Sequence, residues 1–294
     1  MTRPAPAIPG YPFAPRSHQL PDGNILSYLD AGQGPVVVML HGNPSWSFFY
    51  RNLAGLLQEQ YRVIVPDHLG CGLSGKPQDY HYTLANHIAN LESLLDHLAI
   101  EKMTLAVHDW GGAIGMGYAG RHAAAITSFI IFNTAAFRST RIPLRIRICR
   151  TPLLGPLLIR GLNAFAAAAV HMAVVRKMPA AVACGYLLPY DSWRNRIATL
   201  RFVQDIPLSA KDPSWPTLTA VEQGLSQFTR TPMLICWGGR DFCFNDHFYE
   251  QWRSRFPLAE AHYFADAGHY VLEDAFDRIG PLAADFLARQ VASG

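Results

Sequence analysis

The chain has 294 residues, of which 50% are hydrophobic and 16% charged, and its formal net charge is +3. This composition argues against a collagenous or low-complexity chain. The length allows one or two domains, and one large unit of mixed helices and strands is common at this size. The five cysteines include no close pair, which argues against a disulfide framework and a zinc knuckle and favours a reducing compartment.

No targeting or membrane-spanning segment is expected. Residues 1–6 lack the apolar core of a secretory signal. The most apolar run, residues 164–175, is interrupted by His171 and is shorter than the roughly 20 residues that cross a bilayer. We therefore expect a cytoplasmic protein.

Short apolar runs alternate with helical patterns along most of the chain. The runs at residues 18–20 and 25–29 flank Pro21-Asp22-Gly23-Asn24, which predicts a hairpin at an antiparallel edge. Nearly continuous apolar runs then predict strands buried on both faces, at residues 36–40, 62–65, 103–107, 128–132, 232–236 and 261–264. Helical patterns separate several of them, at residues 48–60, 84–98 and 112–122. The alternation predicts a parallel sheet with helices on both faces.

The alternation fails between about residues 138 and 211, which are rich in Ala, Leu and Arg and broken by six prolines, at 143, 152, 156, 179, 189 and 207. Helical turns fit this segment better than strands. We interpret it as a lid inserted into a discontinuous main domain, with a core of residues 1–137 and 214–294 and a cap of residues 138–213.

The charge of this region is uneven, because residues 110–190 contain nine basic residues and no Asp or Glu. A solvated helical face explains this most simply. Docking to an acidic partner or to an anionic membrane surface is the alternative. Nucleic acid is not expected as a partner, because no known binding signature accompanies the charge.

Three side chains that could take part in catalysis follow predicted strands. Asp109 comes after the third apolar run of the parallel sheet, Asp241 after the fifth and His269 after the last. This is the chain order of nucleophile, acid and base in α/β-hydrolases. Gly111 and Gly112 give the clearance that a tight strand-to-helix turn needs. A carboxylate nucleophile needs no proton removed and opens electrophilic carbon to form an ester.

The remaining roles follow from the same edge of the sheet. His269 would activate water or move a proton, with Asp241 fixing its tautomer. Asp246 and Asp266 are also near strand ends and are alternative partners for His269. The Asn43 amide and the Trp110 indole N–H are candidate donors to an anion in front of Asp109. No metal site is predicted, and cofactor-free catalysis is expected.

These residues resemble the haloalkane dehalogenase branch of the α/β-hydrolases. The resemblance lies in His41-Gly42-Asn43-Pro44, His108-Asp109-Trp110-Gly111 and Gly268-His269. It implies an eight-stranded, mostly parallel sheet with a helical cap inserted after strand 6. It also implies Asp109 as nucleophile, His269 as base and Asp241 as acid, with Asn43 and Trp110 as the anion-stabilising pair.

A narrower resemblance is to the β-lactone decarboxylases of bacterial long-chain olefin biosynthesis. The segments that carry it are residues 9–13, 133–137, 178–181, 189–197 and 204–209. It implies a cis-3,4-dialkyl-oxetan-2-one as substrate and a cis-olefin and CO₂ as products. It also implies assembly with the other enzymes of that pathway, for which the basic lid, including Arg145, Arg147 and Arg150, is a candidate docking face.

Several points stay open at this level. Asp109 could attack the lactone carbonyl or the alkoxy carbon. The apolar lid residues either receive alkyl chains or pack the lid on the core; they are Leu153, Leu154, Leu157, Leu158, Phe165 and Met172. The candidate pocket residues are Tyr186, Tyr190, Phe137 and Phe165.

The alternatives in order are a haloalkane dehalogenase, an epoxide hydrolase and a non-catalytic binding protein on the same fold. The epoxide hydrolase would use Tyr186 and Tyr190 to protonate the opening oxygen. The binding protein would require none of Asp109, Asp241 and His269.

Overall fold

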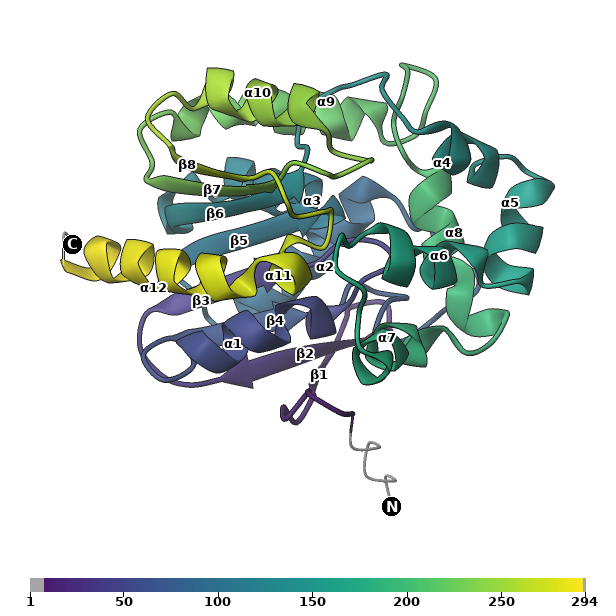
Figure 1. Ribbon diagram of the computed structural model, residues 1–294, viewed down its shortest axis with the longest axis horizontal. Coiled ribbons are helices and arrows are strands. Elements are labelled where there is room, and N and C mark those ends of the chain that lie inside the picture. Colours follow the sequence, from purple (N-terminus) through teal and green to yellow (C-terminus); the bar gives the residue numbers. More distant parts are fainter. Residues whose placement is uncertain (1–7, 293–294) are drawn as a thin grey trace.

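The computed structural model describes residues 8–292, so residues 1–6, expected to lack a secretory signal, lie outside the described part. One sheet organises the chain, with strand order β1-β2-β4-β3-β5-β6-β7-β8 (Figure 1). The strands are β1 Arg16–Gln19, β2 Ile25–Ala31, β3 Val36–Leu40, β4 Arg62–Pro66, β5 Met103–Asp109, β6 Ile126–Thr134, β7 Met233–Gly238 and β8 Glu260–Phe264. The hairpin β1–β2 is antiparallel and the six later strands are parallel to one another, which confirms the predicted architecture.

Alternating side chains of the central strands face two different helix layers. Val38 and Leu40 of β3 belong to one core cluster, whereas Val37 and Met39 belong to the other. The first layer consists of α2 Leu84–His97, α3 Trp110–Arg121, α9 Trp215–Gly224 and α10 Asp246–Arg255. The second consists of α1 Arg51–Leu57, α11 Val271–Asp274 and α12 Phe276–Ala292. The strands are buried on both faces because both faces are covered.

The predicted helices are present with small differences at their ends. The helix expected at residues 48–60 begins as a 3-10 turn, Ser47–Tyr50, and ends at Leu57. Thr83 caps α2 by accepting a hydrogen bond from the Asn86 N–H, and the helix begins at Leu84, the first residue of the predicted pattern. Two further 3-10 turns, Ala123–Ala125 and Leu225–Phe228, follow α3 and α9 and lead into β6 and β7.

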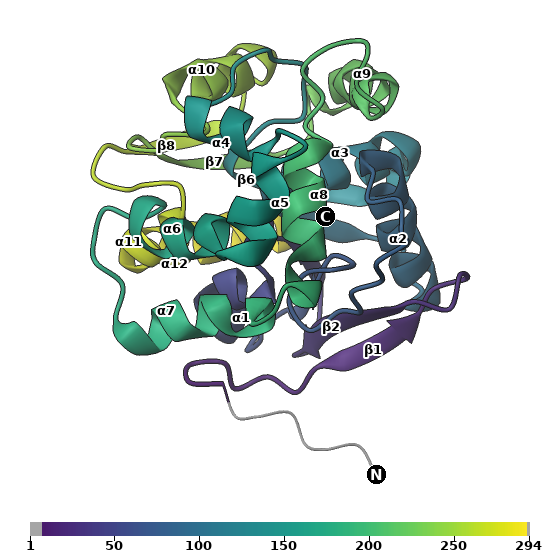
Figure 2. The same ribbon diagram turned by 90° about the vertical axis from the view of Figure 1, so that its right-hand side faces the viewer.

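The proline-broken segment forms a cap between β6 and β7, at one end of the parallel strands (Figures 1 and 2). Its helices are α4 Leu144–Cys149, α5 Leu154–Pro156, α6 Ala164–Met172, α7 Ala180–Leu187 and α8 Ile197–Gln204. A π-helical turn, Leu157–Gly161, and 3-10 turns at Leu188–Tyr190 and Arg194–Arg196 connect them. All of these elements fall within the residues predicted for the cap.

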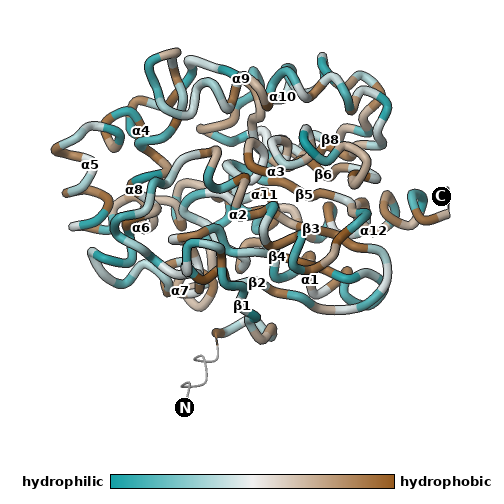
Figure 3. Tube along the Cα trace, turned by 180° about the vertical axis from the view of Figure 1, so that it is seen from behind, coloured by the Kyte–Doolittle hydropathy of each residue, from teal (hydrophilic) through white to brown (hydrophobic). Residues whose placement is uncertain are grey.

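Hydrophobic residues concentrate in the strands and recur in the cap (Figure 3). Among the helices of residues 8–292, none is both long and apolar enough to cross a bilayer. The pair Leu154–Gly161 and Ala164–Met172 reaches that length and hydropathy only in combination, and it is bent by 70°.

Candidate active site

Asp109 occupies a sharp turn between β5 and α3. Its φ is +51°, a backbone conformation that non-glycine residues rarely adopt. The turn requires small neighbours, because a Cβ atom on Gly111 would lie 2.1 Å from the Leu40 carbonyl oxygen. A Cβ atom on Gly112 would lie even closer to the Thr134 hydroxyl. The glycines therefore let the turn lift the Asp109 side chain above the sheet edge.

The Asp109 carboxylate is buried and held by backbone N–H groups. Oδ1 accepts a 2.7 Å hydrogen bond from the N–H of Asn43, and the Trp110 N–H also donates to the carboxylate. Burial raises the pKa of Asp109 above its ordinary value, although His269 and the two N–H groups oppose this. The raised pKa reflects the burial of this carboxylate, which leaves it poorly solvated.

His269 lies between Asp109 and Asp241. Its Nδ1 is 2.7 Å from Asp241 Oδ2, and its Nε2 is 3.6 Å from Asp109 Oδ2. Burial alone would lower the pKa of His269, but the Asp241 carboxylate, helped by Asp109, raises it above its ordinary value. Asp241 is itself fixed, because its Oδ1 accepts a 2.6 Å hydrogen bond from the Cys243 N–H.

The other two acids considered as partners of His269 point elsewhere. Asp246 accepts a hydrogen bond from the Tyr263 hydroxyl, and Asp266 pairs with Arg278. The structure therefore brings Asp241, and not these two, to the histidine.

Asp274, which the sequence did not single out, holds the loop that carries His269. Its carboxylate accepts hydrogen bonds from the N–H groups of Gly268, Val175 and Arg176, at 2.8–2.9 Å. The Tyr270 N–H also donates to the carbonyl of Ala173, at the end of cap helix α6. The cap and the histidine loop are thus tied together. An acid five residues after the histidine was the only sequence signal.

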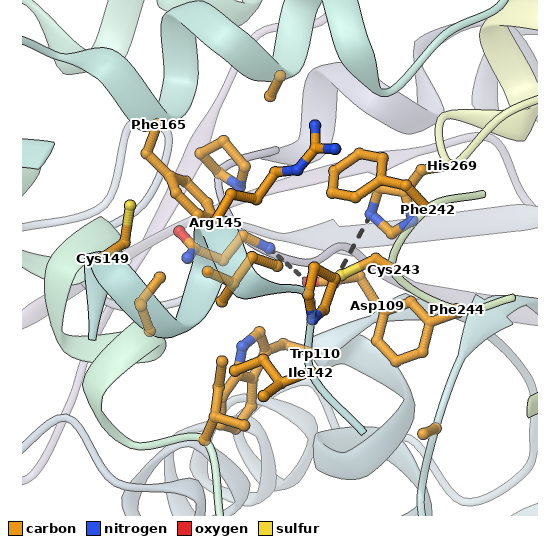
Figure 4. A pocket seen from close by; sticks show the side chains of 18 of the residues that line it. Asp109, Trp110, Ile142, Arg145, Cys149, Phe165, Phe242, Cys243, Phe244 and His269 are labelled. Atoms are coloured by element: carbon orange, nitrogen blue, oxygen red, sulfur yellow. Dashed lines mark hydrogen bonds and ion pairs between the residues drawn. The ribbon is translucent and has the colours of Figure 1, made fainter. Parts of the chain in front are cut away.

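A cavity of about 250 Å³ opens in front of Asp109, between the sheet edge and the cap (Figure 4). Four of the predicted residues line it beside Asp109 and His269, namely Asn43, Trp110, Phe137 and Phe165. Most other lining residues are apolar and come from α4, α6, the π-helical turn and the loops after β6, α8 and β7. Such a cavity suits a hydrophobic substrate.

The two candidate anion donors approach the cavity from different elements. The Asn43 amide donates through Nδ2 to the Thr199 carbonyl, 3.2 Å away in cap helix α8, so it also links core and cap. The Trp110 ring packs against Phe202, with 5.1 Å between ring centroids. Both side chains line the cavity that contains the nucleophile.

Tyr186 and Tyr190 were predicted to line the pocket, and this prediction is wrong. The Tyr186 hydroxyl donates to Glu273 at 2.5 Å, and the Tyr190 hydroxyl donates to the Ser45 carbonyl at 3.2 Å. Both rings are buried in the core cluster that packs against the second helix layer, and neither lines the cavity. Burial with a hydrogen-bonded hydroxyl is the ordinary way to place tyrosine in a core.

The apolar lid residues divide into two groups. Leu158, Phe165 and Met172 line the cavity. Leu153, Leu154 and Leu157 neither line it nor pack on the core, because their exposed fractions are 86%, 51% and 55%. Neither explanation considered for them from the sequence therefore applies to these three leucines.

Polar residues of the cavity wall were also missed, Arg145 and Cys243 among them. Arg145 lines it with its guanidinium 4.8 Å from the centre of the Phe242 ring. The Cys243 thiol lines it too (Figure 4). Burial, and then the charges of Asp241 and Asp109, raise the pKa of Cys243 well above its ordinary value. The thiol is therefore protonated and does not compete with Asp109 as a nucleophile.

Comparison with known proteins agrees with this geometry. The family model described as alpha/beta hydrolase fold matches residues 35–276. The cis-3-alkyl-4-alkyloxetan-2-one decarboxylase of Shewanella oneidensis is 51% identical over 265 residues, which cover 88% of this chain and 83% of that protein. The enzyme of the same name from Xanthomonas campestris is 47% identical over 96% of this chain and 98% of its own. The crystal structure of haloalkane dehalogenase DbeA from Bradyrhizobium elkani is similar with a TM-score of 0.89 and 25% identity, covering 96% of this chain and 100% of that one.

Proposed function

We propose that this chain, which belongs to the α/β-hydrolase family, is a β-lactone decarboxylase that converts cis-3,4-dialkyl-oxetan-2-ones to cis-olefins and CO₂. The observation that carries the proposal is a buried carboxylate nucleophile, Asp109, facing an apolar cavity with N–H donors beside it. The relatives at 51% and 47% identity support the lactone as substrate, because both are decarboxylases of this class by name.

The first step opens the strained ring. A carboxylate oxygen of Asp109 attacks the ring carbon that bears the ring oxygen, and that carbon–oxygen bond breaks. The products are an alkyl ester of Asp109 and a free carboxylate on the neighbouring carbon. Asn43 and Trp110 are the donors available to this new anion, with the charge of Arg145 on the same cavity wall.

The second step releases both products. Attack from the face opposite the ring oxygen leaves the Asp109 oxygen anti to the new carboxylate. The bond between the carboxylate and its carbon then breaks, its electron pair forms the double bond, and Asp109 departs as a carboxylate. The two alkyl groups stay on the same side throughout, so a cis-lactone gives a cis-olefin and CO₂.

These two reaction steps consume no water, so the role of His269 in them is electrostatic. Because Asp241 raises the pKa of His269, the ring carries a proton over a wider pH range. A protonated ring 3.6 Å from Asp109 stabilises the carboxylate as it leaves.

The second candidate is hydrolysis of a carbon–halogen bond. The Asn43 and Trp110 donors favour it, because a departing halide needs the same stabilisation as a carboxylate. An alkyl ester of Asp109 would form here too, without the neighbouring carboxylate, and neutral His269 would then have to activate water to cleave it. The match to dehalogenase DbeA supports this reading at lower identity.

Two expectations about the cellular setting remain proposals. All five cysteines are free thiols, which supports a reducing cytoplasm. Assembly with other enzymes of olefin biosynthesis rests on the family resemblance. Of the three arginines considered for that docking face, Arg150 pairs with Asp212 and Arg145 lines the cavity, so a charge-reversal test is cleanest at Arg147.

The experiment that tests the function is a parallel assay of the purified chain with a cis-β-lactone, a long-chain 1-bromoalkane and a styrene-type epoxide. We expect olefin and CO₂ from the lactone, and their loss in Asp109→Asn, which keeps the size of the side chain. Bromide release without olefin formation would make the dehalogenase the function. Diol formation alone would make it an epoxide hydrolase, although the tyrosines expected for that role do not line the cavity.

A further inference from the structure

The outer side of the cap presents large apolar side chains to solvent. We call these residues the outer cap surface; they are Leu144, Ile148, Leu153, Leu154, Leu157, Leu162 and Trp193. Their exposed fractions run from 39% for Ile148 to 86% for Leu153. A cluster of this kind on one part of a molecule marks an interaction site, whereas single exposed leucines do not.

The outer cap surface is continuous across several elements. Helix α4, which carries Leu144 and Ile148, packs against α5, and the π-helical turn packs against Arg194–Arg196. A Cβ atom on Gly161 would lie 3.4 Å from Leu157 and 3.8 Å from Trp193, so these two side chains flank the same glycine. Figure 2 shows α4, α5 and α8 together on the face turned to the viewer.

The charge around this surface is positive. Arg147 lies on α4 between Leu144 and Ile148, and Arg194 follows Trp193. Both arginines are exposed, and neither forms an ion pair within residues 8–292. The Arg160 guanidinium lies 4.5 Å from the centre of the Trp193 ring. Of the nearby acids, Asp212 pairs with Arg150, whereas Asp191 accepts a hydrogen bond from the neutral Asn195 amide and keeps its charge. The charges of Arg147, Arg160 and Arg194 outnumber that single carboxylate.

The combination of exposed leucines, a tryptophan and unpaired arginines matches an anionic lipid surface better than a protein. Leucine and tryptophan side chains enter the boundary between headgroups and acyl chains, while arginines contact lipid phosphates. The bent pair of apolar helices does not cross the bilayer in this arrangement, because α6 lines the cavity. Of the two helices in this pair, only Leu154–Gly161 is exposed on the outer side of the cap, where it can contact lipid.

We propose that the outer cap surface docks the protein on an anionic bilayer. The surface backs directly onto the cavity, because Leu157 is exposed while Leu158 lines the cavity, and α4 likewise has an exposed side and a lining side. A docked cap therefore sets the cavity wall against the membrane. Delivery of a long-chain lactone from the bilayer rests on the proposed function, whereas the docking itself does not.

The test is flotation of the purified chain with vesicles of phosphatidylcholine that contain about one third phosphatidylglycerol. We expect binding that is at least about ten-fold stronger than to pure phosphatidylcholine and that weakens with added salt. Arg147→Glu should lower binding by roughly ten-fold. The triple variant Leu153→Gln, Leu157→Gln, Leu162→Gln should lower it by about 100-fold.

Matched controls lie away from the cap, between α10 and β8 and just before β7. Leu258→Gln changes a leucine that is 78% exposed, and Arg230→Glu changes an exposed arginine. Both should leave vesicle binding unchanged, and thermal unfolding should show that every variant is folded. Absence of vesicle binding, or equal loss in the controls, would overturn the proposal. So would binding only to a second copy or to an acidic protein. None of these readouts uses enzyme activity, so docking and function can fail separately.

Discussion

The Nε2 atom of His269 lies 3.6 Å from Oδ2 of Asp109, longer than a normal hydrogen bond but close enough for a strong electrostatic interaction. In this position a protonated ring stabilises the Asp109 carboxylate, and a neutral ring has room to direct water toward an ester. The same pair of residues can therefore serve two reactions, and the protonation state of His269 separates them.

His269→Ala should affect the two reactions differently. Decarboxylation uses no water, so the variant should still turn over a cis-β-lactone, at a rate lowered by roughly 10²-fold through loss of the cation. Dehalogenation should stop after one bromide per active site, because the ester is not hydrolysed. Burst and steady-state measurements of bromide and olefin check this. Equal loss of both steady-state rates would contradict the separate roles.

The pH dependence should have opposite signs for the two substrates. Lactone turnover first rises with pH as Asp109 ionises, at a pH above that of an ordinary aspartate, because burial raises its pKa. It then falls as His269 loses its proton, at a pH above the ordinary histidine value. Bromide release should instead rise through the pKa of His269.

Asp241→Asn supplies the control for this pH dependence. The substitution removes the carboxylate that raises the pKa of His269. The part of each pH–rate profile that follows the titration of His269 should therefore move to lower pH. Profiles of kcat against pH, each scaled to its maximum, measure the shift. If this part of the profile did not move, a group other than His269 would be responsible for it.

Trp110→Phe should test the indole donor while keeping most of the packing against Phe202. Loss of one donor to a developing anion typically lowers kcat by about 10²–10³-fold. We expect that loss in kcat for the lactone, with a smaller change in KM. Phe165→Leu, an apolar change in the same cavity, is the matched control and should act mainly on KM. Equal effects of the two variants would mean that Trp110 only shapes the cavity.

Asp274→Asn should loosen the connection between cap and histidine loop. The carboxylate accepts three backbone hydrogen bonds while 1% exposed, and an amide cannot replace all of them. We expect a loss of about 1–3 kcal/mol in the free energy of unfolding, with a lower kcat. Urea unfolding measures the first. Asp277→Asn, at the start of α12, is the control acid; it should leave kcat unchanged and lower the free energy of unfolding by less than about 1 kcal/mol, because it removes only a charge in the first turn of the helix.

Much of the fold followed from the sequence because periodicity and turn signals are local. The run Val36–Leu40 is a strand with the predicted bounds, and Asp22-Gly23 lies in the predicted hairpin. Because parallel strands end at one edge of the sheet, the sequence alone predicted that Asp109, Asp241 and His269 lie close together.

The side-chain orientations in the cap could not be predicted from local patterns in the same way. A helical pattern does not say which side of a short, apolar helix faces a cavity, so Tyr186 and Tyr190 were misplaced and Arg145 was missed. The exposed leucines of residues 153–157 look like core residues in sequence and lie outside. Asp274 was missed because two of its three hydrogen bonds, those from Val175 and Arg176, join segments almost 100 residues apart in the chain.

The most direct test of the account is covalent trapping on His269→Ala with a long-chain 1-bromoalkane, followed by mass analysis of the intact protein and of the peptide that contains residue 109. The account predicts one alkyl group per chain, attached to Asp109, and none when Asp109→Asn is added. An alkyl group on Cys243 or on any other residue, or an unmodified chain after bromide has been released, would contradict it.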